Sequence, residues 1–235
     1  MKKPPILATP WGLYGILMAI LACALVGLAV QGRSTPAAAG TLPKASPEPP
    51  TFIYGNTNAR FTLVEYGDLE CPYCKDVYPQ VKQLIDGHEA LNWQWHHLPL
   101  PMHGAAAQYE ARLVTCAGWF GGNPVFWQAV EAVYQHSRGN GAGLAVPIDQ
   151  LGLQPAVSLQ HLEACIQDNT TVRRVVAEQA ATAAQKRIEA TPTFELRDNR
   201  SGRTIRLPSL LDDAGMLSAM DWLASQGGAD AQQRQ

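Results

Sequence analysis

Two cysteines separated by two residues are the part of this sequence best suited to chemistry. Cys71 and Cys74 enclose Pro72 and Tyr73 and follow closely on an apolar run, Phe61 to Tyr66. Such a pair can close a small disulfide ring or bind a metal ion. A structural zinc site normally needs a second Cys/His pair at ligand spacing, and the sequence has no second C-x-x-C motif. The motif therefore predicts a redox-active pair.

The residues after Cys71 predict a helix that activates this cysteine. Proline is favoured in the first helical turn, and Pro72 opens an amphipathic stretch that ends at Gly87. Cys71 would then lie at the helix N-terminus, where the macrodipole and free N–H groups stabilise a thiolate. Cys74 lies one turn later on the same face and can reach back to it. We therefore expect Cys71 to be the nucleophile and Cys74 the resolving thiol.

Three histidines leave a metal-binding alternative open. His96, His97 and His103 could join the cysteines in a copper- or zinc-binding module that is not an enzyme. Adjacent residues on a strand point to opposite faces, however, so His96 and His97 cannot easily serve one site. We therefore expect no metal. The near balance of 18 basic and 20 acidic residues gives no indication of nucleic-acid binding.

The elements needed to position the cysteines indicate an α/β fold with a helical insertion. Strands are predicted at 61–66, 91–96, 192–196 and 204–207, the last two joined by a turn at 199–202. Helices are predicted at 72–87, 105–120, 123–136, 157–167 and 171–188, and a final one begins at Asp212 or Asp213. A strand-helix-strand start requires a parallel strand pair. Trp93, Trp95, Trp119 and Trp127 are expected to be core aromatics.

The N-terminal region predicts export. Trp11 to Val30 carries no charge and follows Lys2 and Lys3, and about 20 apolar residues suffice to span a bilayer. We expect residues 1–32 to form a membrane anchor, with a cleaved signal peptide as the alternative. The Pro/Ala-rich segment 33–51 predicts a semi-rigid linker. Residues 52–226 would form the folded domain, with its insertion at about 104–188, and 227–235 a disordered tail.

These motifs together resemble the DsbA-like thiol:disulfide oxidoreductases, which have a thioredoxin fold with an inserted helical domain. The resemblance covers about residues 51–225. It rests on Glu65, six positions before Cys71, and on Thr191-Pro192-Thr193-Phe194, which looks like the family segment whose proline is cis and lies beside the active disulfide. His97-Leu98-Pro99-Leu100, followed by His103, is similar to the family's link into the helical insert. The Pro72-Tyr73 dipeptide departs from the Pro-His of the best-known members, and Thr191 replaces a valine of the archetypal oxidase.

The resemblance implies an enzyme that oxidises cysteine pairs in exported proteins of the periplasm. It would need no cofactor beyond the Cys71–Cys74 disulfide, and it would work with a membrane or periplasmic redox partner. Pro192 would leave the preceding carbonyl free to pair with a bound peptide. Substrates are expected to contact Pro72, Tyr73, Thr191 and Pro192. A membrane-tethered disulfide reductase or an isomerase is the alternative.

Three acidic residues precede the cysteine motif. Glu65 lies in an apolar strand beside Leu63 and Val64, which favours burial, and the resemblance implies that it accepts a proton near Cys74. Asp68 and Glu70 are expected to be solvated loop charges.

Cys116 and Cys165 complete an even set of four cysteines outside the apolar segment, which contains Cys23. In an oxidising compartment, two thiols of one helical domain are expected to pair. Some DsbA-like relatives carry such a second bridge. We therefore expect a structural disulfide, with two buried thiols as the alternative.

Overall fold

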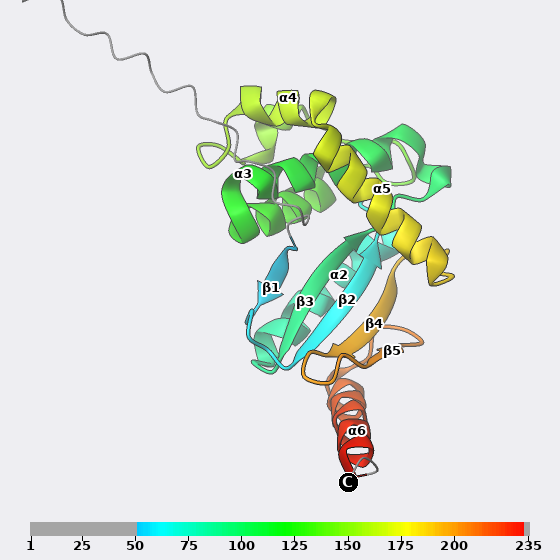
Figure 1. The fold of residues 1–235 in the computed structure, drawn as a ribbon. Coiled ribbons are helices and arrows are strands. Elements are labelled where there is room, and N and C mark those ends of the chain that lie inside the picture. Colours follow the sequence, from blue (N-terminus) through cyan, green and yellow to red (C-terminus); the bar gives the residue numbers. More distant parts are fainter. Residues whose placement is uncertain (1–50, 233–235) are drawn as a thin grey trace, which may run out of the picture. The chain divides into compact units, whose positions relative to one another are not determined.

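The computed structural model describes residues 51–232, with side chains described to residue 226, and has a five-stranded sheet at its centre (Figure 1). The strands are β1 (Ile53–Gly55), β2 (Phe61–Gly67), β3 (Leu91–His97), β4 (Thr193–Asp198) and β5 (Thr204–Arg206), in the spatial order β1-β3-β2-β4-β5. β2 runs parallel to β3, as predicted, and antiparallel to β4. β2 is central and buried along its whole length, so residues at its end are held rigidly.

Helix α2 follows β2 and carries the cysteine motif into the core. It spans Pro72–Gly87, as predicted. Its buried side chains recur every three or four residues, the spacing of one helical face, and are Cys74, Tyr78, Val81, Leu84 and Ile85. Packing of this face on the sheet fixes the orientation of the first helical turn.

Three helices confirm the predicted insertion between β3 and β4. They are α3 (Gly104–His136), α4 (Leu159–Asp168) and α5 (Thr170–Gln185), with short 3₁₀ turns η1 (Pro101–His103) and η2 (Ile148–Leu151). The predicted break at Gly121-Gly122 is a kink within α3, where Gly122 has φ 71. Glycine adopts this left-handed region without the steric cost that a Cβ would impose.

β1 is a strand that the sequence did not indicate. It has three residues, none of them buried, and pairs antiparallel with the edge of β3. The N–H of Ile53 donates to Asn123 Oδ1 at 2.9 Å, which ties β1 to α3.

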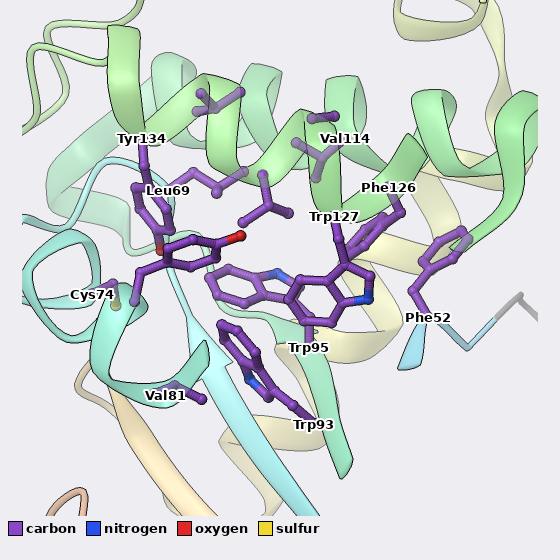
Figure 2. Packing of buried hydrophobic residues seen from close by; sticks show 14 of the residues in the cluster. Phe52, Leu69, Cys74, Val81, Trp93, Trp95, Val114, Phe126, Trp127 and Tyr134 are labelled. Carbon is purple, nitrogen blue, oxygen red and sulfur yellow. The ribbon is translucent and has the colours of Figure 1, made fainter. Parts of the chain in front are cut away.

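Aromatic side chains fill the space between the sheet, α2 and α3 (Figure 2). Trp93, Trp95 and Trp127 are buried, as predicted, and the ring centroids of Trp93 and Trp127 lie 4.4 Å apart. Trp119 differs from the prediction because it is only partly buried at the edge of this core. The core joins the helical insertion directly to the element that carries Cys74.

The C-terminal helix is longer than expected. α6 spans Asp213–Gln232, and Met216, Met220 and Leu223 are buried on one face, as predicted. The helix continues through residues 227–232, the first part of the segment 227–235 that the sequence predicts to be a disordered tail.

No helix within residues 51–232 is long and apolar enough to cross a membrane. The predicted anchor at 11–30, the linker up to residue 50 and residues 233–235 lie outside the described residues.

Candidate active site

Cys71 and Cys74 lie at the N-terminal end of α2 and are both free thiols. Cys71 is the N-cap residue, with Pro72 at the first helical position. The side chain of Cys71 is nearly buried and that of Cys74 completely so. Figure 2 shows Cys74 at the edge of the aromatic core, on the side where Tyr134 approaches from α3. The resolving position is therefore closed to solvent.

The surroundings of the two thiols shift their pKa values in opposite directions. A hydrogen bond from Cys74 lowers the pKa of Cys71 from 9.0 to about 5, although burial opposes the shift. The Thr191 side chain and the N–H groups of Cys74 and Tyr73 contribute to the same lowering of the Cys71 pKa. Burial and the bond to Cys71 raise the pKa of Cys74 well above 9.0. At neutral pH, Cys71 is therefore a thiolate and Cys74 a thiol.

The segment before β4 brings a cis proline to the cysteines. The Thr191–Pro192 peptide bond is cis, and the Thr191 carbonyl accepts a hydrogen bond from Cys71 Sγ at 3.4 Å when the thiol is protonated. Thr191 is buried, and its hydroxyl has no hydrogen-bond partner within residues 51–226 while Cys71 is neutral. The hydroxyl is thus available to stabilise the thiolate.

Glu65 is a completely buried carboxyl group on β2. Neither of its oxygens has a partner with hydrogen-bond geometry among the described side chains. Burial raises the pKa of Glu65 from 4.5 to about 8, with Trp93 opposing and the negative charge of Cys71 adding to the shift. The charge of Glu65 in turn raises the pKa of Cys74. The charge of Glu65 therefore favours the protonated form of Cys74, and the charge of Cys71 favours the protonated form of Glu65.

Two exposed apolar side chains lie close to the site in sequence or structure. Tyr73, inside the motif, is 70% exposed, and Met102, in η1, is 80% exposed. Pro72 and Pro192 are half-buried. The sequence indicated Tyr73 but not η1, whose His103 and the preceding Leu100 both hydrogen-bond to Asp68 in the loop before Cys71, because no local pattern shows this proximity.

The expectation for Asp68 and Glu70 is wrong, because both side chains are buried. Asp68 accepts hydrogen bonds from the N–H groups of Glu70 (2.9 Å) and Leu100 (2.7 Å). His103 Nδ1 is a third partner, at 2.7 Å. Polar groups contributed by segments distant in sequence replace the water that the prediction assumed.

The histidines are used structurally. His97 Nδ1 accepts from the Trp95 indole at 2.9 Å. The Thr115 hydroxyl donates to Ala111 O, so His97 Nε2 must donate to Thr115 Oγ1 at 3.0 Å. Burial lowers the pKa of His97 to about 3, which keeps the ring neutral. Within residues 51–232, no group of three or more His, Cys, Asp or Glu side chains could hold a metal ion.

Cys116 and Cys165 form a disulfide between α3 and α4. Their Cα atoms lie 6.0 Å apart across a sequence separation of 49, and both residues are buried. The bond closes the helical insertion on itself, because it joins α3 to α4.

Comparison with known proteins agrees with this geometry. The model of a protein family described as thioredoxin matches residues 47–210. The structure of Pseudomonas aeruginosa DsbA2 is 43% identical, with a TM-score of 0.70, over 77% of this chain and 98% of that chain. A thioredoxin-like oxidoreductase from Silicibacter pomeroyi shares the fold at 20% identity and a TM-score of 0.60, over 76% of this chain and 94% of that chain.

Among curated proteins, the Na(+)/H(+) antiporter NhaA 1 of Salinispora arenicola is 29% identical over 160 residues, which are 67% of this chain and 23% of the antiporter. The chain spans about a quarter or less of the length of the curated relatives it matches. The family match and the likeness to DsbA2 both cover most of the described residues. The chain therefore belongs to the thioredoxin family, within its DsbA-like group of thiol:disulfide oxidoreductases.

Proposed function

We propose that this chain oxidises cysteine pairs in exported proteins by donating its Cys71–Cys74 disulfide. The observation that carries the proposal is the opposite shift of the two pKa values. A thiolate stabilised at Cys71 favours the reduced enzyme, so the disulfide is readily transferred to a substrate.

The exchange proceeds in two steps. A substrate thiolate attacks Cys71 Sγ of the oxidised enzyme, the Cys71–Cys74 bond breaks, and Cys74 leaves with the electron pair. The second substrate thiolate then attacks the substrate sulfur of the mixed disulfide. Cys71 leaves as a stabilised thiolate, and the substrate holds the new disulfide. Each leaving sulfur takes up the two electrons that the bond releases.

Glu65 supplies the proton that Cys74 needs when it leaves. Its raised pKa of about 8 keeps it largely protonated at neutral pH, and its coupling to Cys74 supports proton exchange between them. Substrate backbone would pair with the Thr191 segment next to the cis Pro192, and Pro72 and Tyr73 would contact it from the other side. The exposure of Tyr73 supports this role.

The domain organisation predicted from sequence belongs to the same proposal. Residues 11–30 would anchor the chain in the inner membrane, with the linker 33–51 holding domain 52–226 in the periplasm, where a membrane or periplasmic redox partner reoxidises Cys71 and Cys74. The uncharged stretch behind Lys2 and Lys3 supports it. Carbonate extraction of membranes tests it: release of the full-length chain into the soluble fraction would exclude an anchor.

The equilibrium constant with glutathione tests the oxidase assignment. We expect an oxidising enzyme. At equilibrium with glutathione, the reduced form of the enzyme should then predominate over the oxidised form. Cys71→Ala should abolish dithiol oxidation, and Cys74→Ala should accumulate mixed disulfides with substrates. A strongly reducing constant would point to a reductase instead. Faster alkylation of Cys74 than of Cys71 in the reduced protein would reverse the assigned roles.

A further inference from the structure

The loop that follows α3 encloses the side chain of Glu70, the residue that precedes Cys71. Four residues of this loop have positive φ, namely Gly139, Asn140, Gly141 and Gly143. Glu70 Oε1 accepts a hydrogen bond from Ser137 Oγ at 2.7 Å, and Oε2 accepts from the N–H of Gly143 at 3.2 Å. The Asn140 N–H donates to the backbone carbonyl of Glu70 at 2.8 Å. Backbone N–H groups turned inward in this way form a concave binding site for an anion.

A second carboxyl group, Glu110 of α3, meets Glu70 in the protein interior. Both side chains are completely buried. Neither Glu110 oxygen accepts from an N–H or hydroxyl group among the described residues, and its hydrogen-bond partner is the Glu70 carboxylate. A carboxylate has no hydrogen to donate, so one member of the pair must carry a proton.

The surroundings decide which residue holds the proton. Burial and the Glu70 charge raise the pKa of Glu110 from 4.5 to about 10. Burial opposes ionisation of Glu70 too, but hydrogen bonds from Glu110 and Ser137 outweigh it and lower its pKa. The other charged groups nearby are Asp68, which also raises the pKa of Glu110, with its partner His103, and Lys75, which donates to Ser137 O at 3.2 Å. Neither His103 nor Lys75 hydrogen-bonds to Glu110 among the described residues.

We propose that Glu110 stays protonated and donates its hydrogen to the Glu70 carboxylate, and that this pair is a positioning device for Cys71. It joins α3, the 137–143 loop and the chain segment directly before the nucleophile. Cys71 is held from the same segment, because its N–H donates to Asp68 O at 3.1 Å. The inference rests on the proposed function only in taking Cys71 as the attacking thiol.

The shared proton is tested by stability against pH, without any measurement of activity. The pKa of Glu110 is higher in the folded than in the unfolded chain, so folding takes up a proton between these values and loses stability as the pH rises. Glu110→Gln keeps an N–H donor for Glu70 but cannot ionise. The ratio of the unfolding constants of wild type and Glu110→Gln should therefore rise by up to about tenfold per pH unit between pH 5 and 9. A ratio that is constant over this range overturns the shared proton.

The positioning role is tested by the alkylation rate of Cys71 and the equilibrium with glutathione. Glu110→Gln should retain both, since the amide replaces the acid as donor. Glu110→Leu removes the donor and should slow alkylation at pH 7 by about tenfold, because small displacements of a reacting group are costly. Val114→Ala, which opens a cavity in the same helix, is the matched control and should leave the rate unchanged.

Each outcome decides the positioning role. Unchanged alkylation in Glu110→Leu, or equal losses in Glu110→Gln and Glu110→Leu, would overturn it. If Glu110→Leu does not fold, Glu110→Gln still tests the positioning role. A loss in its alkylation rate as large as that of a Glu70→Ala variant would show that the amide cannot replace the acid, and would overturn the role. Failure of the proposed function would give a different result from failure of the positioning role. Cys71→Ala would then keep oxidase activity, while the pH dependence of the stability ratio between wild type and Glu110→Gln would persist.

Discussion

At the scale of single residues, burial rather than residue type separates the roles of the ionisable groups around Cys71. Glu65 and Glu110 are buried, no described N–H or hydroxyl group meets hydrogen-bond geometry with their oxygens, and burial raises the pKa of each; the Trp93 indole offsets only part of the rise for Glu65. Glu70 and Asp68 are equally buried but accept several hydrogen bonds. The same side chain is therefore an acid at one position and a fixed anion five positions away.

Replacing Glu65 by glutamine should separate its catalytic role from its effect on stability. We expect Glu65→Gln to slow turnover at pH 7 by up to about 10²-fold, the lower end of what a positioned acid–base group contributes. The pKa of Glu65 is raised on folding, so the stability of wild type relative to the variant should fall as the pH rises from 4.5 to about 8. Rate–pH profiles and urea titrations measure both.

Val64→Ala on the same strand provides the control for this prediction. Val64 is buried, so the variant should lose stability without a change in the pH dependence of the rate. A Glu65→Gln rate profile identical in shape to that of wild type would exclude proton transfer through Glu65.

At the scale of elements, sequence patterns predicted the parts of the fold that local rules control. The helix after Cys71 and the central β2 were predictable, because Pro72 marks a helix start and Phe61–Tyr66 is an apolar run. β1 could not be predicted, since its three residues have no alternation and are held by pairing with β3. Its position depends on contacts, not on propensity.

The candidate site was predictable in its covalent chemistry but not in its buried acids. The Cys71–Cys74 spacing and the Thr191-Pro192 pair can be recognised from the sequence alone. The burial of Glu70 depends on a loop 67 residues away that supplies Ser137, and Glu110 is one of many polar residues in a long helical pattern. Interactions between segments distant in sequence leave no local signal, which is why charges next to the motif were expected to be solvated.

The Cys116–Cys165 bond should stabilise the helical insertion without affecting the active site. Closing a loop of this size contributes about 4 kcal/mol in the chain-entropy model, so Cys116→Ala/Cys165→Ala should lower the free energy of unfolding by about 2–4 kcal/mol. Calorimetry should show a Tm lower by about 5–15 °C. The glutathione equilibrium of Cys71 and Cys74 should stay within twofold of wild type, and a larger change would show that the bond supports the active site.

At the scale of the whole molecule, the site lies where segments from three parts of the chain converge. The loop 68–71 follows the central strand, the loop 137–143 ends the first helix of the insertion, and Thr191 begins the return to the sheet. Each holds Cys71 or its neighbour by a hydrogen bond. The chemistry of a single thiol therefore depends on the folding of the described residues as a unit, and its ionisation must in turn contribute to their stability.

The last prediction links the pKa of Cys71 to the stability of the whole chain. This pKa is about 5 in the folded reduced protein and 9.0 in the unfolded chain, so the resulting stabilisation is fully present above pH 9 and is lost as the pH falls to 5. The oxidised protein has no such proton. The free energy of unfolding of the reduced protein, minus that of the oxidised protein, is therefore expected to rise with pH. Between pH 5 and 7 this difference should increase by up to about 1.4 kcal/mol per pH unit. Urea titrations of both forms measure it, and a difference that does not vary with pH would show that Cys71 is not a thiolate in the folded protein.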